Sequence, residues 1–304
     1  MKPTSLRVKV FPGAQNLPIT VALEDGLFRQ EGLHVELLFT KNSEELRSGL
    51  AVGQFDLVHT AVDNAVAMYE KGNHDVLVLA GGDSGLNELF VQPTIDSLAE
   101  LRGKTVIVDA PDTAYALQLK AALARHGLAP DADYHVHPVG ATFKRLEALR
   151  QNPEFSASIL NPPFSIIARQ EGFRSLGSLV GIIGSYQATA LFGMRSWVQD
   201  KRDVVTRYLV GYLRGLRRVL EPVYAGRNVS LLQRQLNISD DVARRTLAAL
   251  TDAHSGLTAD ARLSPAGIAT VLSLRASFEP SGDRQFSPAQ IDESLLMTAL
   301  ESLR

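Results

Sequence analysis

The feature that most constrains the fold of this chain is an alternation of short apolar runs with segments of helical periodicity. In the first 82 residues, runs with the length and apolar content of β-strands lie at residues 6–11, 33–39, 55–60 and 76–79. Turn-forming residues and then a helical pattern follow the first three of these runs. Strands that alternate with helices form βαβ units, whose strands lie parallel in one sheet. This part of the chain is therefore predicted to be an α/β unit.

A glycine-rich segment at residues 81–85, Gly-Gly-Asp-Ser-Gly, interrupts the alternation, which then begins again. Further strand patterns occur at residues 105–108, 134–138 and 157–160. A second turn-rich segment at residues 184–188 precedes the apolar residues 189–194. Because 304 residues exceed the size that one hydrophobic core usually supports, we expect two α/β units joined by two crossings of the chain.

The last third of the chain has helical periodicity only. The predicted helices lie at residues 203–224, 230–236, 240–250, 265–277 and 288–303. A helical region that follows two α/β units is expected to pack around the outside of one of them.

Composition excludes several classes of function. The net charge of −2, from 31 basic and 33 acidic residues, argues against nucleic-acid binding, which needs a concentrated basic surface. The absence of cysteine excludes disulfides, thiolate nucleophiles and cysteine-bound metals. His135 and His137 share one face of a predicted strand, where we expect them to face solvent rather than bind a metal. No motif for a cofactor is present, so we expect none.

Four segments, in this order and spacing, carry a resemblance to a known family. They are residues 22–36, residues 43–57, residues 101–108 and the helix beginning near Trp197. Together they resemble the solute-binding components of ABC transporters for nitrate, sulfonates and taurine, and the related thiamine-pyrimidine-precursor proteins. The resemblance spans most of the chain and is specific to the superfamily, but not to one ligand.

This resemblance implies an α/β, two-lobed periplasmic-binding-protein type II fold. The first lobe would comprise residues 1–86 and 188–304, with the C-terminal helices packed on it, and the second lobe, residues 87–187, would be inserted into the first. A small organic molecule would bind in the cleft between the lobes and be delivered to an ABC permease. We expect a monomer that does not span a membrane.

The sequence is compatible with two cellular compartments for this protein. The chain begins Met-Lys-Pro-Thr-Ser and continues into a predicted strand without an apolar leader segment. No apolar run approaches the roughly 20 residues that span a bilayer. A mature form of the protein would be periplasmic, whereas a complete gene product of this sequence would be cytoplasmic.

Candidate ligand contacts follow the predicted strands, because ligands of open α/β sheets bind outside the carboxyl ends of the strands. They combine aromatic rings with neutral polar groups, the usual composition of a small-molecule site. The candidates are Phe11, Gln15, Asn16, Thr40, Asn42, His59, Thr60, Asp63, Asn64, Thr113, Tyr115, Thr142, Phe143, Asn161, Phe164 and Tyr186. Helix capping by the polar residues and core packing by the aromatic residues are the alternative interpretations.

The charge of the ligand is limited by the few cations in these loops. Lys41 and Lys144 are the main ones, and no pair of N–H donors from an arginine is evident for a carboxylate. This pattern disfavours a doubly charged anion. A monoanion, or a neutral or cationic heteroaromatic compound, is expected instead.

Two alternative functions stay open beside ligand delivery. A cytoplasmic enzyme of this fold could use His59 with Asp63, four residues later, as an acid–base pair, for example in a decarboxylation. A desulfinase of this architecture would need a cysteine nucleophile, which the chain lacks. A cytoplasmic ligand sensor is the other alternative. We favour a binding protein without catalytic residues.

Overall fold

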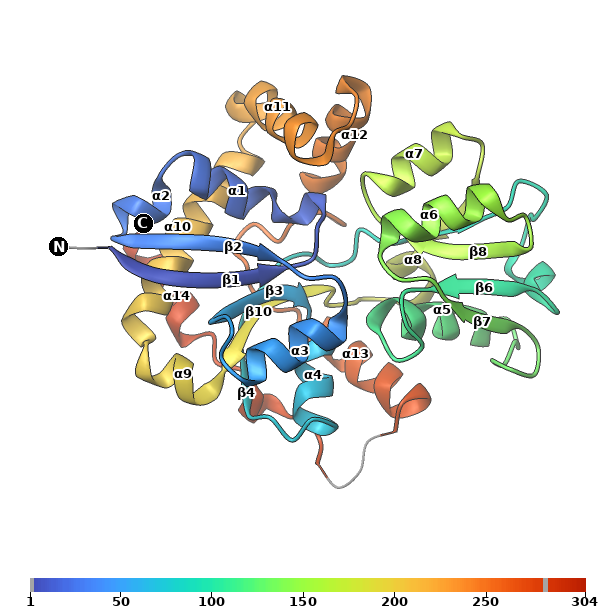
Figure 1. Cartoon of the computed structure of the whole chain (residues 1–304), viewed down its shortest axis with the longest axis horizontal. Coiled ribbons are helices and arrows are strands. Elements are labelled where there is room, and N and C mark those ends of the chain that lie inside the picture. Colours follow the sequence, from blue (N-terminus) through green and yellow to red (C-terminus); the bar gives the residue numbers. More distant parts are fainter. Residues whose placement is uncertain (1–2, 281–283) are drawn as a thin grey trace.

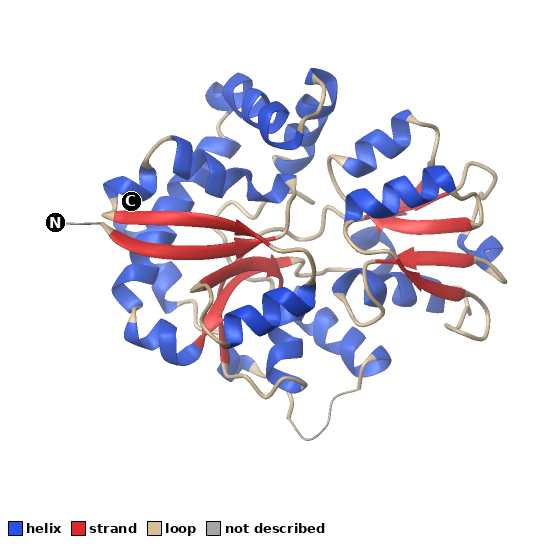
Figure 2. Cartoon of the chain, viewed as in Figure 1, coloured by secondary structure: helices blue, strands red, loops and turns tan. Residues whose placement is uncertain are grey.

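The computed structural model describes residues 3–280 and 284–304, which form two lobes that each contain a five-stranded sheet (Figures 1 and 2). We call the lobe with strand order β2-β1-β3-β10-β4 the first lobe, and the lobe with order β7-β6-β8-β5-β9 the second lobe. The first and last described residues, Pro3 and Arg304, lie on the first lobe, at its end far from the second lobe (Figure 1).

The N-terminal part of the first lobe alternates strands and helices as predicted. Its elements are β1 (Thr4–Val10), η1 (Ala14–Asn16), α1 (Leu17–Glu24), α2 (Leu27–Gln30), β2 (Leu33–Phe39), α3 (Ser43–Ala51), β3 (Leu57–Ala61), α4 (Asp63–Glu70) and β4 (Val76–Gly81).

The second lobe follows directly in the chain. Its elements are β5 (Glu88–Val91), η2 (Leu98–Leu101), β6 (Thr105–Val108), α5 (Ala114–Ala124), β7 (His135–Pro138), α6 (Thr142–Gln151), β8 (Phe155–Leu160), α7 (Phe164–Gln170), β9 (Arg174–Ser178) and α8 (Leu179–Ile183).

The chain then returns to the first lobe and ends in helices. These elements are β10 (Thr189–Met194), α9 (Arg195–Asp200), α10 (Arg202–Leu220), η3 (Pro222–Tyr224), α11 (Ala225–Leu236), α12 (Asp240–Leu250), α13 (Pro265–Phe278), η4 (Pro288–Gln290) and α14 (Ser294–Ser302).

The two sheets share one topology. In each, three neighbouring strands are parallel, namely β2, β1 and β3 in the first lobe and β7, β6 and β8 in the second. The next strand is antiparallel to both of its neighbours, and it is the strand that enters from the other lobe: β10 in the first lobe and β5 in the second. The carboxyl ends of all the other strands therefore face the opposite lobe.

Successive side chains of a strand point to opposite faces of the sheet, so they pack into different hydrophobic cores. Leu57 and Leu77 face the core formed with α1, α2, α10 and α14, whereas Val58 and Val78 face the opposite side. The core on that opposite side continues into the second lobe and includes Ile268 of α13. The two lobes thus share one apolar core behind the cleft.

Two strands and several helices differ from the sequence prediction. Helix α8 was not predicted, and the helix predicted over residues 203–224 ends at Leu220, before the separate 3₁₀ turn η3. Strands β5 and β9 were not predicted, because each is short and β9 contains Gly177, with φ of 117°. The segment predicted as one helix over residues 288–303 contains the 3₁₀ turn η4 and the separate helix α14. They are divided at Ile291, whose backbone pairs with Val78 of β4. Residues 1–2 of the predicted first lobe lie outside the described residues, as do 281–283.

The close packing of α10 on α1 can be tested by substitution of a glycine in the core formed with α1, α2, α10 and α14. A Cβ atom on Gly215 would lie 2.3 Å from the carbonyl oxygen of Pro18 and 3.0 Å from the Cβ of Ala22. We predict that Gly215→Ala lowers the free energy of unfolding by about 1–3 kcal/mol, because the helices must move apart. Urea unfolding measures this change.

Gly226→Ala is the matched control. Gly226 lies in α11, and a Cβ atom there would have no neighbour within 4 Å. Alanine should raise the free energy of unfolding by up to about 1 kcal/mol, since it has the higher helix propensity. Equal effects of the two substitutions would contradict the close approach of α10 to α1.

Candidate ligand-binding site

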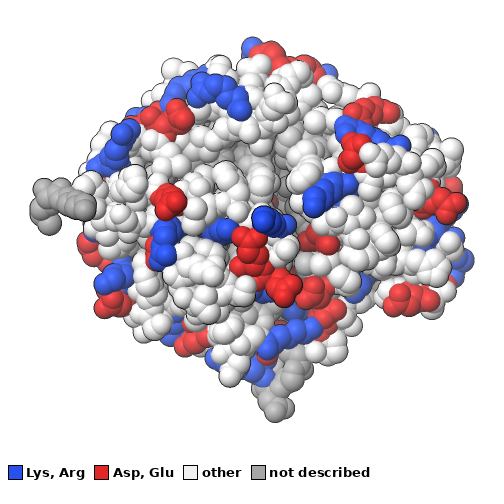
Figure 3. Space-filling model, viewed as in Figure 1, with Lys and Arg blue, Asp and Glu red and all other residues white. Residues whose placement is uncertain are grey.

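A cavity lies between the two lobes at the carboxyl ends of the parallel strands. It encloses about 880 Å³ of space, its opening to solvent included. The loops after β1, β2 and β3 form one wall, and the loops after β6, β7 and β8 form the other. Figure 3 shows the groove between the lobes, with Lys or Arg side chains near its rim on both sides.

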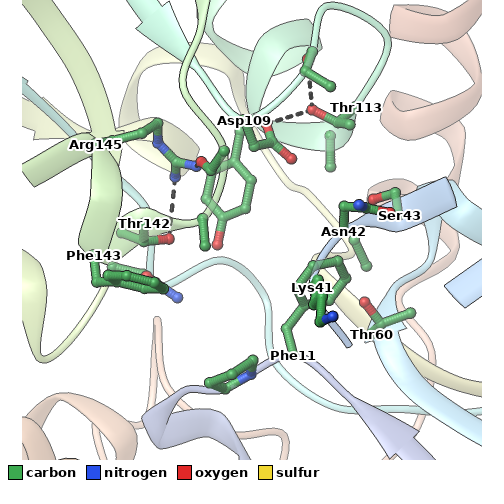
Figure 4. Close-up of a pocket in the computed structure, with 18 of the residues that line it drawn as sticks. Phe11, Lys41, Asn42, Ser43, Thr60, Asp109, Thr113, Thr142, Phe143 and Arg145 are labelled. Atoms are coloured by element: carbon green, nitrogen blue, oxygen red, sulfur yellow. Dashed lines mark hydrogen bonds between the residues drawn. The ribbon is translucent and has the colours of Figure 1, made fainter. Parts of the chain in front are cut away.

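The first-lobe wall presents a lysine and several neutral polar groups (Figure 4). Lys41 lines the cavity, and its side chain forms no ion pair among the residues that the structure describes. Asn42 also lines it and caps α3, since its Oδ1 accepts a hydrogen bond from the Glu45 backbone N–H at 2.8 Å. Asn64 is buried with its Oδ1 lacking a donor, so this amide is free to bind a ligand.

The second-lobe wall is organised by a buried arginine. Arg145 is only 1% exposed, and its guanidinium donates to the Gly140 carbonyl at 2.7 Å and the Thr142 hydroxyl at 3.1 Å (Figure 4). Both acceptors line the cavity, where the loop after β7 enters α6. The charge of Arg145 also acts on the neighbouring Asp109 carboxyl, lowering a pKa that burial raises above its usual range. The arginine therefore fixes the loop and supplies positive charge.

Among the described residues, several helices begin at the cavity without a side-chain cap, and three of them present free N–H groups in their first turn. These are α4, α5 and α6, and the hydroxyl of Thr113 at the start of α5 is bonded to Asp109 and the Ala110 carbonyl instead (Figure 4). The first N–H groups of a helix have no partner within the helix, and they carry the positive end of its dipole. The cavity is therefore surrounded by backbone donors that favour an anion.

Aromatic rings supply the apolar part of the lining. Phe11 comes from the first lobe, while Tyr115, Phe143 and Phe164 come from the second. The Tyr115 ring lies 4.6 Å from the Arg145 guanidinium carbon, which holds the ring in place. Phe143 is 50% exposed at the cavity and is thus available to cover a bound molecule.

The structure brings most of the predicted contact residues together. The cavity lining includes Phe11, Gln15, Asn42, Thr60, Asn64, Thr113, Tyr115, Thr142, Phe143, Asn161 and Phe164. Tyr186 lines a smaller adjoining cavity. Their contact with a ligand stays a prediction.

The other predicted residues do not line either cavity. Asn16 donates its side-chain N–H to the Phe11 carbonyl at 2.6 Å, and the Thr40 hydroxyl bonds the Asn42 carbonyl at 2.9 Å. His59 lies against Tyr212, with 4.7 Å between ring centroids. Asp63 pairs with Arg275 at 2.9 Å, so it does not serve as the partner of His59. The structure gives no support to an acid–base pair of His59 and Asp63 in the cleft.

Sequence reasoning missed Arg145 and Asp109 as lining residues. Asp109 directly follows a predicted strand and could have been included by the rule applied to the other loops. Arg145 lies inside a helix, where a basic residue is usually solvated. The only signal in the sequence was its position three residues after Thr142, which places both side chains on the same face of the first helical turn.

Comparison with known proteins identifies the family. Residues 14–222 match the family described as NMT1/THI5 like. The chain belongs to this family. A putative ABC transporter periplasmic binding protein of Brachyspira hyodysenteriae is 22% identical to this NMT1/THI5-like protein over 228 residues. The match covers 69% of this chain and 64% of the length of that relative.

Solved structures confirm the predicted fold. The periplasmic nitrate-binding protein of Synechocystis superposes with a TM-score of 0.82 at 12% identity, covering all of this chain and 90% of the other. The alkanesulfonate-binding protein of Xanthomonas axonopodis, bound to MOPS, gives a TM-score of 0.78 at 17% identity, covering 96% and 99%. This NMT1/THI5-like protein therefore has the periplasmic-binding-protein fold.

The described residues contain no cluster of three or more His, Cys, Asp or Glu side chains placed to hold a metal ion. None of their helices is both long enough and apolar enough to cross a membrane.

The burial of His59 generates a prediction about pH. Burial lowers the pKa of this imidazole from 6.5 to about 3. Between these values the unfolded chain binds a proton that the folded chain does not, so the free energy of unfolding falls as the pH falls from 6.5 towards 3. His59 should contribute up to about 1.4 kcal/mol per pH unit to this slope.

We predict that His59→Leu reduces the pH dependence of stability. Urea unfolding at pH 7, 5 and 4 measures the slope for the wild type and the variant. The exposed His34 on β2 provides the matched control, His34→Gln, which should keep the wild-type slope. An unchanged slope in His59→Leu would show that His59 is not held neutral.

Proposed function

We propose that this protein is the solute-binding component of an ABC import system and that its cleft takes a small organic molecule with one anionic group and an aromatic or apolar body. Family membership supports the proposal, as do the named functions of the relatives, which include a periplasmic nitrate-binding and an alkanesulfonate-binding protein. A system of this kind would place the protein in the periplasm as a monomer beside a membrane permease.

The charge balance of the cavity is the observation that supports a ligand with one negative charge. Lys41 and Arg145 supply two positive charges to the lining, and Asp109 supplies one negative charge. The net charge of the lining, with Asp109 ionised, is therefore +1. Together with the uncapped starts of α4, α5 and α6, this balance suits one negative charge bound largely by neutral donors. A neutral heteroaromatic ligand would leave Lys41 without a partner.

Closure of the lobes would bury the ligand. Gly85 and Gly184 lie in the two crossings with φ of 114° and 94°, a region that glycine adopts readily. We place the hinge there, between a first lobe of residues 1–86 and 188–304 and a second lobe of residues 87–187. A ligand that contacts loops of both lobes stabilises the closed arrangement, which the permease would recognise.

Contacts across the cleft support this mechanism. Arg47 of α3 lies 3.7 Å from Asp112, which follows β6 in the second lobe. On another side, the Gln170 amide of α7 donates to Asp241 of α12 at 2.8 Å. Both pairs have exposed or half-exposed members, so water can replace them when the lobes separate.

The ligand class can be tested by a thermal-shift screen of sulfonates, nitrate, aromatic carboxylates, pyrimidines and flavins. A ligand at 100 times its Kd adds about 2.7 kcal/mol to the free energy of unfolding, which gives a clear shift. We predict that the strongest hit is a monoanion recovered intact by mass spectrometry. Consumption of the hit would instead establish an enzyme, and a preference for neutral pyrimidines or flavins would contradict the monoanion.

Lys41→Gln tests the anion contact. Loss of a charge-assisted hydrogen bond of about 1.5–3 kcal/mol should raise the Kd for the best monoanion at least tenfold. Isothermal titration calorimetry measures this change. Lys144→Gln is the matched control, because Lys144 lies in α6 close to the cavity but is not part of its lining. Equal losses in both variants would indicate long-range attraction rather than contact.

Small-angle scattering tests closure. We predict that the radius of gyration decreases when the best monoanion is added to the wild-type protein at saturation, because the lobes move together. An unchanged radius with saturating ligand would contradict the hinge mechanism.

A further inference from the structure

A second, smaller cavity adjoins the main one at the crossings between the lobes. It encloses about 390 Å³, its openings included. Residues of the lining that are shared with the main cavity are Gln15, Ala61, Ala114, Tyr115 and Asn161, so the two spaces are contiguous. The residues of its own include Asp83, which follows β4, and Thr189, which begins β10.

Asp83 is held firmly in this cavity. Its carboxylate accepts hydrogen bonds from the Thr189 hydroxyl and from the Gly85 backbone N–H at 3.0 Å. Its own backbone carbonyl accepts from the Ala188 N–H at 3.1 Å, which ties the two crossings together. The Leu86 backbone N–H also bonds this carboxylate. A carboxylate has about four acceptor positions, so these three donors leave one position for another donor.

Asp83 is a buried carboxylate without a cation. It is 3% exposed and forms no ion pair among residues 3–280 and 284–304. Asp63 and Asp25, which are also shielded from water, each pair with arginine: Asp63 with Arg275, and Asp25 with two arginines of α10 and α11. A buried charge is costly unless an opposite charge compensates it. Burial accordingly raises the pKa of the Asp83 carboxyl.

A second acceptor, which has no donor among the described residues, belongs to Gln15, a residue that lines both cavities. The Oε1 atom of Gln15 is buried and has no donor in the described structure, although Gln15 lines both spaces. An unpartnered buried acceptor is unfavourable until a donor reaches it. An ammonium group has three donors and no acceptor, and its positive charge would compensate the Asp83 carboxylate.

We propose that the smaller cavity is a subsite for a protonated amine, with Asp83 as its counter-ion. This inference deepens the proposed function and rests on it: the ligand of the cleft would be a zwitterion, with its anionic group near Lys41 and its ammonium group at Asp83. The aromatic rings of the main cavity would contact the apolar part between the two charges.

The test compares benzylammonium with benzyl alcohol, which has the same ring and nearly the same size but no charge. Isothermal titration calorimetry of the wild-type protein should give at least tenfold tighter binding of benzylammonium. Asp83→Asn should abolish this preference, because the amide keeps an acceptor for the Gly85 N–H but removes the charge.

Asp75→Asn is the matched control. Asp75 immediately precedes β4, at the opposite end of the strand from Asp83, and it pairs with Arg195 on the surface. The variant makes the same charge change without touching the subsite, so it should keep the preference for benzylammonium.

Several results would overturn the subsite. They are equal binding of the two probes to the wild type, no binding of benzylammonium, or a preference that survives in Asp83→Asn. A protonated, neutral Asp83 would give the first of these results. If Asp83→Asn does not fold, the wild-type comparison decides alone. Titration with benzenesulfonate separates the two proposals, because anion binding depends on Lys41 and should persist in Asp83→Asn.

Discussion

The direction in which the chain enters each lobe determines the rest of this structure. Strand β4 ends at the cleft, so β5 must enter the second lobe from the cleft side and run away from it. The same holds for β10 on the return to the first lobe. Each entering strand is therefore antiparallel in an otherwise parallel sheet. Because of this arrangement, the carboxyl ends of the parallel strands of both lobes face each other, and the loops that follow them meet in one cavity.

A shared apolar core joins the two lobes in addition to the two crossings of the chain. The apolar side chains of α3 and α4 continue through α13 to α5 and α8, so the lobes are not joined by the crossings alone. Arg275 fastens α13 to α4 through a buried pair with Asp63, and both side chains are almost fully buried. Removal of one partner would leave the other charge uncompensated in the core. Movement of the lobes is therefore expected at the crossings, with α13 as a common base.

The electrostatics of the cleft depend on which charges are already compensated. Arg145 serves two roles, since it fixes the loop at Gly140 and Thr142 and also offsets Asp109 across the same wall. Lys41 and Asp83 are different, because neither has an ion-pair partner in the described structure. One lies on the main cavity and the other on the smaller one. A zwitterionic ligand spanning the two spaces would compensate both charges at once.

The sequence by itself determined the α/β class, the helical C-terminal region and the loops that form the cavity. These features are local, because the period of apolar residues and the turn formers between them are read within a few positions. The tertiary structure alone decided the burial of His59 and the lack of an ion-pair partner for Asp83 among the described residues. It also decided that Arg145 lines the cavity. Such properties depend on neighbours far along the chain: Asp83 and Thr189, for example, are separated by 106 positions.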